Sequence, residues 1–406
     1  MKILILGGSG GMGRFASSAV SSISGIDSIT IADINETAAS DFAKSFNDDR
    51  ITGIGLNVLD KDSLRKLTAS KDVVLNLTGP FFKLAYPILE IALEQNCHYL
   101  DICDDWEPTE KMFSLNKLAE EKNKIAILGL GASPGITNML ALKAMNELDK
   151  VSNVYTGWNV SGAKPEEESS QTGANAAMEH GVEQMTGQVK VYMKKSFKMV
   201  RPLTRVNVQY PQLGKFKASI FGHPEAITFP HHYPDISTSL NLMHGNDPAA
   251  VFVFKVIRFF VEIKLLTKNL AAKIMEQLER SKVSKPKDIL NSLPEVYGLA
   301  QGLKNETETI VAVTLDGFEE NMSMGAATGY PLACGLKMLL EKKITKFGVL
   351  APEACGLDPD NFFDELSGFL GDGAQIKTIV TQEALNLSLI HISEPTRRYA
   401  ISYAVF

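Results

Sequence analysis

The stretch MKILILGGSGGMGRFASSAVSSISGIDSITIAD, residues 1–33, decides the fold of this chain. Lys2 to Leu6 is a short apolar run of the kind that forms a buried parallel strand. The strand ends in a glycine-rich turn that contains G-x-G-x-x-G at Gly8, Gly10 and Gly13. The first two glycines allow a sharp turn and a close approach to a pyrophosphate, and the third lets the next helix pack near the strand. That helix turns unpaired backbone N–H groups and the positive end of its dipole toward the phosphates.

A second strand, residues 28–32, ends at Asp33, twenty residues after Gly13. An acid at this offset accepts hydrogen bonds from the ribose diol of an adenosine. This combination distinguishes a dinucleotide-binding site from an ordinary glycine turn: a strand, a glycine turn, a helix, a second strand and an acid at its end. The charge of Asp33 would repel a 2′-phosphate, so the sequence favours NAD over NADP. Arg14, which follows the last glycine, can reach such a phosphate and keeps NADP open.

Two further turns are predicted to contact the cofactor. Asp60 follows a third strand, residues 51–58. Thr78, Gly79 and Pro80 follow a fourth, almost continuously apolar strand, and ligands bind at such carboxyl ends. We expect this turn under the nicotinamide, although Gly-Pro is also an ordinary breaker pair. The full set of predicted cofactor-binding residues is Gly8, Ser9, Gly10, Gly11, Met12, Gly13, Arg14, Asp33, Asp60, Thr78, Gly79 and Pro80.

Length and composition bound the class of protein. A chain of 406 residues exceeds what one core usually serves, so two domains are expected. A hydrophobic content of 45% and a charged content of 22% are ordinary for a soluble globular protein. The net charge of −6 offers no basic surface for nucleic acid, and the N-terminus lacks the pattern of a secretory signal. Four cysteines without metal-type spacing indicate free thiols, which predicts a cytoplasmic protein.

Acidic residues close the fifth predicted strand on the side where ligands bind. Asp101 and Asp104 lie at its carboxyl end, whereas His98 opens it at the opposite edge of the sheet. We therefore predict Asp101 or Asp104 as the proton-transfer group, and His98 as structural. The alternative is that acids after a strand only cap the next helix, as Asp105 can before Trp106.

The sixth predicted strand, residues 125–130, ends in Gly-Ala-Ser-Pro-Gly. Ser133 followed by Pro134 is a good helix start, since the hydroxyl can cap the helix and proline needs no N–H partner there. A helix N-terminus at this place suits a carboxylate, so Ser133 and Gly135 are predicted to hold the substrate anion. A well-capped helix without a ligand is the alternative.

Three of the seven histidines fall in one stretch of the second half of the chain. His223 is predicted to contact the substrate, and His231 is the second choice of proton-transfer group, because imidazole titrates near neutral pH. His231 and His232 would point to opposite sides of an extended chain, and no other ligand spacing surrounds them. No metal site is predicted.

Several longer segments carry a family resemblance. The glycine loop with LNLTGPF, HYLDICDD and GLGASPGITNMLA resembles the saccharopine dehydrogenase-like oxidoreductases. FGHPEAITFP and MGAATGYPLACGLKMLLEKKITKFGVLAPEACGLDP resemble the second half of that family, so the likeness spans most of residues 1–370. It implies an NAD(P)-dependent enzyme with a Rossmann domain, a second α/β domain and a late helix that returns to the first. Saccharopine reductases carry Asp before Pro-Gly, an acid that meets the substrate; this chain has Ser133, which argues against saccharopine itself.

The predicted fold class is α/β, a Rossmann-type doubly wound parallel sheet with a second α/β (α+β) domain for substrate binding and dimerisation. We expect the dinucleotide-binding domain in residues 1–138 and the substrate domain in residues 139–325. A helix with Pro331 in its first turn and a tail, residues 326–386, are expected to return to the first domain. Residues 387–406 look like a translated sequencing adapter, so we expect the natural chain to depart there.

The most apolar segment, residues 249–266, carries four charges at roughly helical spacing. A charge at the centre of a bilayer costs at least about 2.5 kcal/mol, so no transmembrane segment is predicted. We expect this helix to be buried between domains or in a homodimer interface, with a membrane surface as the alternative. A polar loop at residues 164–175 is expected to be a surface connection, or else a lid.

Together these observations predict an oxidoreductase that moves a hydride between NAD(P) and a small carboxylated or amino substrate, at a C–N or C–O bond. The enzymatic alternative is a carboxynorspermidine-type polyamine reductase. The alternative from another class is a redox-sensing protein that binds the dinucleotide without turnover.

Overall fold

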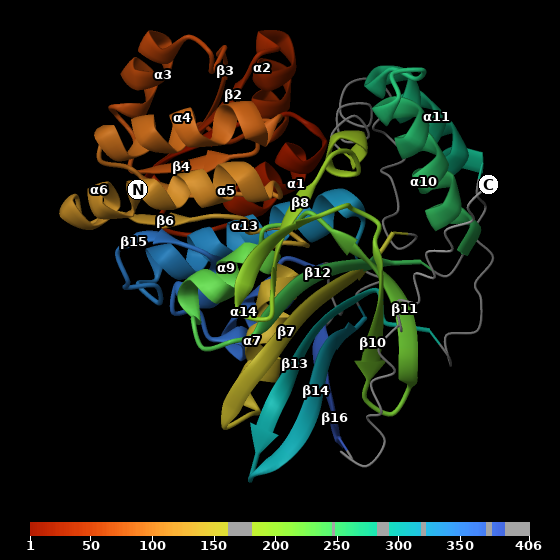
Figure 1. The fold of residues 1–406 in the computed structure, drawn as a ribbon. Coiled ribbons are helices and arrows are strands. Elements are labelled where there is room, and N and C mark those ends of the chain that lie inside the picture. The colour runs from red at the N-terminus through yellow and green to blue at the C-terminus, as the bar shows by residue number, and fades with distance from the viewer. Residues whose placement is uncertain (161–180, 246–247, 282–291, 318–321, 371–375, 386–406) are drawn as a thin grey trace, which may run out of the picture.

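The computed structural model describes residues 1–160, 181–245, 248–281, 292–317, 322–370 and 376–385. These residues form two parts, each built on a β-sheet, that pack against each other (Figure 1). The elements of the first part are β1 (Lys2–Leu6), α1 (Gly11–Ser21), β2 (Ser28–Asp33), α2 (Glu36–Ser45), β3 (Ile51–Gly55), α3 (Lys61–Thr68), β4 (Val73–Asn76), α4 (Phe81–Glu94), β5 (His98–Asp101), α5 (Trp106–Met112), η1 (Phe113–Leu115), α6 (Asn116–Glu121), β6 (Ile125–Ile127), α13 (Met324–Leu340) and β15 (Gly348–Leu350).

The first sheet has the strand order β15-β6-β5-β4-β1-β2-β3, and each neighbouring pair is parallel. Helices pack against its faces, so a central strand such as β1 is apolar and Ile3, Leu4 and Ile5 are fully buried. The order β3-β2-β1-β4-β5-β6 is that of the doubly wound dinucleotide-binding fold. The Rossmann-type first domain predicted from the sequence is confirmed.

The chain returns to this sheet after it has built most of the second one, as predicted. Helix α13 runs along α1, and β15 adds a strand beside β6. A Cβ at Gly329 of α13 would lie 2.6 Å from the backbone N of Ala16 and 2.9 Å from the backbone O of Met12. Glycine at this position therefore lets the two helices approach closely.

The start of α13 differs from the prediction. The helix begins at Met324, and the hydroxyl of its N-cap residue Ser323 accepts a hydrogen bond from the backbone N of Ala326 at 3.2 Å. Pro331 consequently lies inside the helix instead of in its first turn. The helix is largely buried, and this packing outweighs the backbone hydrogen bond that proline cannot donate.

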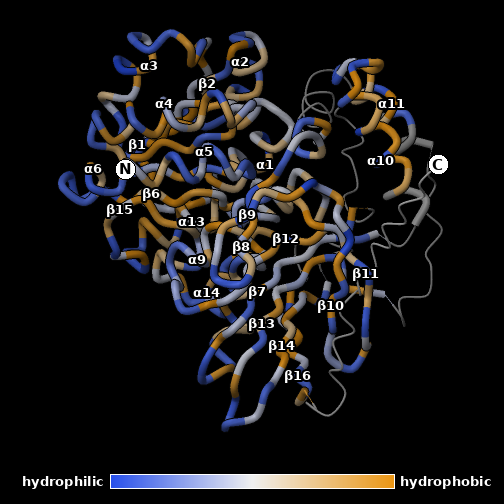
Figure 2. The backbone as a smooth tube through the Cα atoms, in the orientation of Figure 1, coloured by the Kyte–Doolittle hydropathy of each residue, from blue (hydrophilic) through white to orange (hydrophobic). Residues whose placement is uncertain are grey.

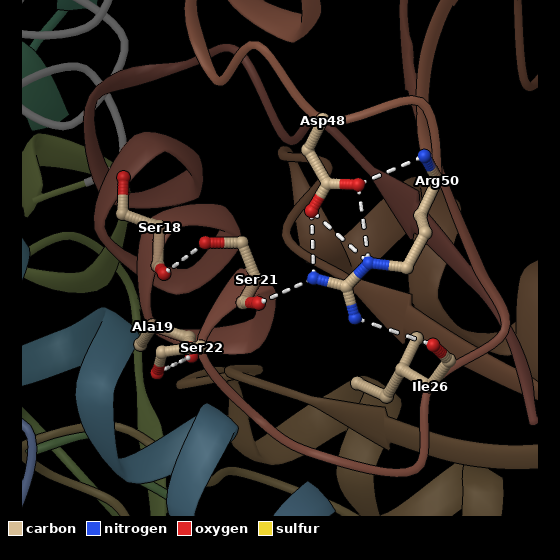
Figure 3. Close-up of polar contacts among 7 residues, drawn as sticks. All are labelled: Ser18, Ala19, Ser21, Ser22, Ile26, Asp48 and Arg50. Carbon is tan, nitrogen blue, oxygen red and sulfur yellow. Dashed lines mark hydrogen bonds and ion pairs between the residues drawn. The ribbon is translucent and has the colours of Figure 1, made fainter.

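The far end of α1 is held by a single arginine (Figure 3). Arg50 donates hydrogen bonds to the backbone oxygens of Ser21 at 3.2 Å and Ile26 at 3.3 Å. The carboxylate of Asp48 fixes the guanidinium with contacts of 2.6 to 3.1 Å, and this pairing lowers the pKa of Asp48. Helix α1, which begins in the glycine loop, is thus anchored at its other end as well.

The second part is built around a mixed sheet. Its order is β10-β11-β12-β7-β13-β14-β16, and β8 pairs with β12 and with β9. Among the described strands of this second sheet, β12 and β7 are the only parallel pair. Its elements are α7 (Ile136–Asn146), β7 (Lys150–Asn159), β8 (Val189–Met193), β9 (Ser196–Val200), β10 (Arg205–Tyr210), β11 (Gly214–Phe221), α9 (Glu225–His232), β12 (Thr238–His244), α10 (Pro248–Glu262), α11 (Lys268–Ser281), β13 (Val296–Lys304), β14 (Thr307–Asp316), η3 (Pro352–Ala354), α14 (Pro359–Ser367) and β16 (Lys377–Ala384).

Two segments differ from the predicted domain limits. Helix α7 begins at Ile136, inside the range predicted for the first domain, but packs against β13 of the second sheet. A Cβ at Gly298 of β13 would lie 2.0 Å from the backbone N of Ala141. Strand β16 pairs with β14 in the second sheet, so this part of the tail does not return to the first domain as expected. The polar loop predicted at residues 164–175 and the tail at residues 387–406 lie outside the described residues.

The apolar segment forms a hairpin of two helices, α10 and α11, at the side of the second sheet (Figure 1). One of its faces is not buried between the two parts, because Phe252 and Phe259 are exposed at 65% and 55%; burial in a homodimer interface stays a prediction. Orange, hydrophobic stretches of this hairpin are visible in Figure 2. None of the described helices combines the length and the apolar character needed to cross a bilayer.

Candidate functional site

The glycine loop has the close contacts that its motif predicts. A Cβ at Gly13 would lie 2.1 Å from the backbone O of Gly7 and 2.8 Å from the Cα of Gly8, so the third glycine is sterically required. Gly10 is the N-cap of α1, with no side chain to occupy the helix start. A Cβ at Gly11 would meet no atom within 4 Å. The helix N-terminus therefore faces open space of the kind an anionic diphosphate requires.

Ser9, Arg14 and Asp33 meet beside this loop. The hydroxyl of Ser9 donates to Oδ2 of Asp33 at 2.8 Å, and Nε of Arg14 donates to the backbone O of Ser9 at 3.0 Å. The Arg14 guanidinium also lies over the ring of Phe42, 4.5 Å from its centroid. A carboxylate that can accept from a ribose diol and a guanidinium that can bind a phosphate thus share one corner of the site.

The turn after β4 lies against the glycine loop. A Cβ at Gly7 would be 2.9 Å from the backbone O of Leu77 and 3.3 Å from the backbone N of Thr78. Oγ1 of Thr78 is buried and has no hydrogen-bond partner among the described residues. A Cβ at Gly79 would meet no atom within 4 Å. An unpaired hydroxyl beside open space fits a polar group of a bound cofactor.

Asp60 lies at the start of α3, where it has a local role. Its Oδ1 accepts from the backbone N of Ser63 at 3.2 Å and its Oδ2 from the Ser63 hydroxyl at 2.6 Å. These bonds lower the pKa of Asp60. They are the contacts of a helix N-cap, which favours capping over the predicted contact with the cofactor.

Helix α7 does not begin as the sequence suggested. Its N-cap is Gly135 at φ 119°, and Oδ1 of Asn138 accepts from the Gly135 backbone N at 2.7 Å. A Cβ at Gly135 would lie 2.1 Å from the backbone O of Gly131, so both conformation and space require glycine. Ser133 is consequently free of the capping role predicted for it and belongs to a different set of contacts.

Ser133 joins a buried polar cluster at the junction of the two parts. Its Oγ donates to Oε1 of Glu225 at 2.7 Å and lies 3.1 Å from Nδ1 of His223. Oε1 of Glu225 also accepts from Oγ1 of Thr137 at 2.8 Å. Nδ2 of Asn241 lies 2.9 Å from the same Oε1 and 3.1 Å from the Ser133 Oγ. The structure therefore brings the predicted Ser133 and His223 together.

Aromatic packing fixes the orientation of this cluster. The His223 ring stacks on the indole of Trp158, with centroids 5.4 Å apart and planes 10° apart. The indole Nε1 in turn donates to Oδ1 of Asn241 at 3.1 Å. The side-chain oxygen of Asn241 thus accepts from Trp158, and its nitrogen donates to Glu225. Stacking on Trp158 fixes the plane of the His223 imidazole.

Hydrogen-bond accounting assigns the protons of this chain of groups. An ionised Glu225 can only accept, so the Ser133 hydroxyl donates to it. The Ser133 oxygen can then accept from Nδ1–H of His223, and in that tautomer of the neutral ring Nε2 carries no proton. In this tautomer Nε2 is the ring nitrogen that can take up a proton.

Comparison with known proteins gives the family. The model of the saccharopine dehydrogenase NADP-binding domain matches residues 3–127, and that of the saccharopine dehydrogenase C-terminal domain matches residues 131–372. The chain belongs to the saccharopine dehydrogenase family. The family resemblance predicted from the sequence is confirmed, and the family is one of NAD(P)-binding oxidoreductases. The match also supports a nicotinamide dinucleotide as the cofactor, without distinguishing NAD from NADP.

Solved structures add to the evidence for the fold. Apo histidine-tagged saccharopine dehydrogenase (L-Glu forming) from Saccharomyces cerevisiae is similar to this chain, with 15% identity and a TM-score of 0.61 over 94% of this chain and 99% of that one. An oxidoreductase from Agrobacterium radiobacter in complex with NAD+, L-tartaric acid and magnesium has 10% identity and a TM-score of 0.42, with coverage of 93% and 98%. Only the first likeness is strong enough to support the fold.

In this saccharopine dehydrogenase-family chain, Asp101 is buried inside the first domain. Its Oδ1 accepts from the backbone N of Cys103 at 3.1 Å and of Gly129 at 2.7 Å, and its Oδ2 from the Tyr99 hydroxyl at 2.8 Å. Burial raises the pKa of Asp101 to about 6, although these hydrogen bonds act against the shift. Such contacts brace the loops after β5 and β6, and they favour a positioning role over the predicted proton transfer.

The second acid, Asp104, lies in the loop that reaches the second part. Nε2 of Gln184 donates to the backbone O of Asp104 at 3.2 Å and approaches Oδ1 of Asp105 at 3.4 Å. A Cβ at Gly222 would lie 3.7 Å from the Trp106 ring. The loop of Asp104 is therefore adjacent to the segment that carries His223.

His231 is not brought to the Ser133 cluster. Its ring stacks on Phe113 of η1, with centroids 4.1 Å apart and planes 8° apart. Burial lowers the pKa of His231 below its ordinary value. Nε2 of the adjacent His232 accepts from the backbone N of Ala351 at 3.4 Å. Both contacts favour a structural role for the end of α9 over the predicted proton transfer.

Sequence reasoning missed Glu225, the acid of the cluster. Glu225 is completely buried, and Glu353 of η3 lies nearby, where its Oε2 accepts from Nδ2 of Asn138 at 2.7 Å. Burial raises the pKa of Glu353 to about 7. The available signal was a lone acid at the start of the apolar run EAITFP, because buried carboxylates need dedicated partners. In the described part of the chain, no group of three or more His, Cys, Asp or Glu is placed to hold a metal ion.

Proposed function

We propose that the protein is an NAD(P)-dependent oxidoreductase that transfers a hydride at a C–N or C–O bond of a small carboxylated or amino substrate. The observation that carries the proposal is the presence of two sites in one chain. One is a glycine loop with its helix N-terminus and the unpaired Thr78 hydroxyl, which fit a dinucleotide. The other is the Ser133–His223–Glu225 cluster, which can accept and hold a proton.

The dinucleotide would supply the hydride chemistry, and the protein residues supply binding and proton transfer. The glycine loop would hold the diphosphate, Asp33 would bind the ribose diol, and the turn at Thr78 would contact the nicotinamide half. His223 exchanges the proton at Nε2, with Ser133 and Glu225 as positioning residues. Asp104, from the adjacent loop, remains the second candidate for this step.

The Glu225 carboxylate also bears on the substrate. Members of the family with an acid before Pro-Gly present a carboxylate at that point of the loop, where this chain has Ser133. Here the carboxylate comes from α9 and lies behind the Ser133 hydroxyl. A substrate amino group would therefore meet a hydroxyl first, with the negative charge one bond further away, so we propose a neutral amine, imine or carbonyl group at this position.

For the cofactor we propose a preference for NAD, supported by the Asp33 carboxylate that Ser9 orients toward the loop. Arg14 lies close enough to accept NADP as well, once its guanidinium leaves the Phe42 ring and gives up the hydrogen bond to the backbone O of Ser9. Arg14→Ala is expected to weaken NADPH binding about tenfold or more and to leave NADH binding nearly unchanged, because a charged hydrogen bond is worth about 1.5–3 kcal/mol. Fluorescence titration with both nucleotides measures this.

The test of the function uses the whole purified chain. NADH and NADPH are offered with a panel of keto acids and amines, and the loss of absorbance of the reduced nucleotide is followed. Turnover that falls at least about a hundredfold in His223→Asn, with nucleotide affinity unchanged, is the expected result. Tight nucleotide binding without turnover over the whole panel would instead support the redox-sensing alternative. Light scattering of the same preparations measures the predicted homodimer, which, like the cytoplasmic location, stays a prediction.

A further inference from the structure

Helix α10 carries two apolar faces, and the protein buries only one of them. The buried face contains Ile257 and Val261, which pack with Phe221 and Met243 of the second sheet. The second face points away from this cluster. Its members recur at intervals of three and four residues, which places them on one side of the helix: Phe252, Val256, Phe259 and Phe260, followed by Ile263 directly after the last helical residue.

This second face continues across the turn into α11. Leu265, at the tip of the hairpin, is 73% exposed, and Leu270 in the first turn of α11 is half exposed. The hairpin lies at the edge of the molecule in Figure 1, beside the second sheet and away from the layered first domain. Three exposed phenylalanines with four exposed aliphatic side chains on one hairpin exceed what a folded protein leaves to water without a partner.

The charge of the hairpin is opposite to that of the whole chain. Residues 248–281 contain six lysines and arginines but three glutamates, in a chain with a net charge of −6. Lys264 forms no ion pair among the described side chains, whereas Lys268 pairs with Glu183 at 2.6 Å. Burial lowers the pKa of Lys255 in α10, and the positive charges of Arg205 and Arg258 lower it further. Positive charge is thus concentrated around the exposed apolar face.

The dimensions of α10 exclude a spanning role. The helix has 15 residues, and a transmembrane helix needs about 20. A helix with phenylalanine and leucine on one side and basic residues at its borders has the composition of one that lies in the plane of a membrane interface. A second copy of the chain is a poorer partner, because two such hairpins would bring like charges together.

We propose that the exposed face of α10 and the tip of the hairpin, defined by Phe252, Val256, Phe259, Phe260, Ile263, Leu265 and Leu270, dock on the surface of an anionic lipid bilayer. The phenylalanines enter the boundary between headgroups and acyl chains, and Lys264 and Lys273 contact the headgroups. This surface is separate from the Ser133 cluster and does not depend on any catalytic activity of the protein.

The test is sedimentation of the full chain with vesicles, in the absence of nucleotide. Phosphatidylcholine vesicles that contain about 30% phosphatidylserine should carry the protein down, pure phosphatidylcholine vesicles should carry much less, and salt should weaken the binding. Phe259→Ser with Phe260→Ser should reduce partitioning at least about tenfold. Lys264→Gln should reduce it about fivefold. The matched control is Phe347→Ser, a phenylalanine 44% exposed in another part of the surface, which should bind vesicles like the parent.

Each variant is first checked for an unchanged circular dichroism spectrum and unchanged NADH binding. Binding that is equal on neutral and anionic vesicles, or that survives the double phenylalanine substitution, overturns the proposal. The proposal is also overturned if light scattering shows a dimer that the double substitution converts to a monomer, while the parent protein does not bind vesicles. Failure of the hydride-transfer assay leaves the vesicle result intact, so the two proposals fail separately.

Discussion

Replacing Ser133 by the acid of the saccharopine reductases is expected to destabilise this protein in a pH-dependent way. In Ser133→Asp, a second carboxylate would stand where the serine Oγ now lies 2.7 Å from Oε1 of Glu225. At an effective dielectric constant of about 20, two negative charges about 3 Å apart repel by about 5 kcal/mol. The pair therefore retains one proton at neutral pH, and the pKa of one carboxyl is raised in the folded state.

The sign of the pH dependence follows from this raised pKa. A carboxyl that keeps its proton only in the folded state costs about 1.4 kcal/mol for each pH unit above its ordinary pKa near 4. The variant should thus lose about 1.4 kcal/mol at pH 5 relative to the parent, and about 5 kcal/mol at pH 8.

Urea unfolding at several pH values, followed by far-UV circular dichroism, measures the difference between variant and parent. Ser133→Asn is the matched control: it has the same shape without the charge, and its loss of stability should not change between pH 5 and pH 8. A Ser133→Asp protein whose loss is equally independent of pH would show that Glu225 carries no charge beside this position, and the proton assignment to His223 would fall with it.

Two further predictions concern the cofactor loop and the second buried acid. Gly13→Ala should weaken NADH binding and cost about 1–3 kcal/mol of stability, because its Cβ would lie 2.1 Å from the Gly7 oxygen; Gly11→Ala, whose Cβ would stand in the open space at the helix start, should weaken NADH binding in the same fluorescence titration without that loss of stability. Glu353, with its pKa raised from 4.5 to about 7, contributes stability that is present below pH 4.5 and lost as the pH rises through 7. Glu353→Gln should therefore flatten the pH profile of urea unfolding over that window by up to about 3 kcal/mol, and an unchanged profile would refute this.

What the sequence predicted well is encoded locally. The glycine loop and Asp33 lie within one strand–helix–strand unit, where spacing alone places each residue relative to a dinucleotide. Glu225 and Asn241 could not be found in this way, because they lie 92 and 108 positions from Ser133 and meet it only when the two parts pack. Periodicity assigns a face to a helix, but not the partner that covers it.

The start of α7 shows a second limit. Ser133 before proline is a good cap by composition, yet the cap is Gly135, because Gly131 approaches so closely that a side chain cannot fit. The exposed face of α10 shows a third. An apolar stripe in the sequence predicts a buried helix face, but the structure leaves Phe252 and Leu265 exposed.

The late addition of β15 has a consequence for biosynthesis. When the first 150 residues have left the ribosome, the outer edge of β6 is unpaired, and it stays so until Gly348–Leu350 and α13 emerge some 200 residues later. During that interval the nascent chain presents an open strand edge that other chains can join. A truncated nucleotide domain would keep this edge permanently, so we expect the excised fragment to aggregate where the intact polypeptide does not.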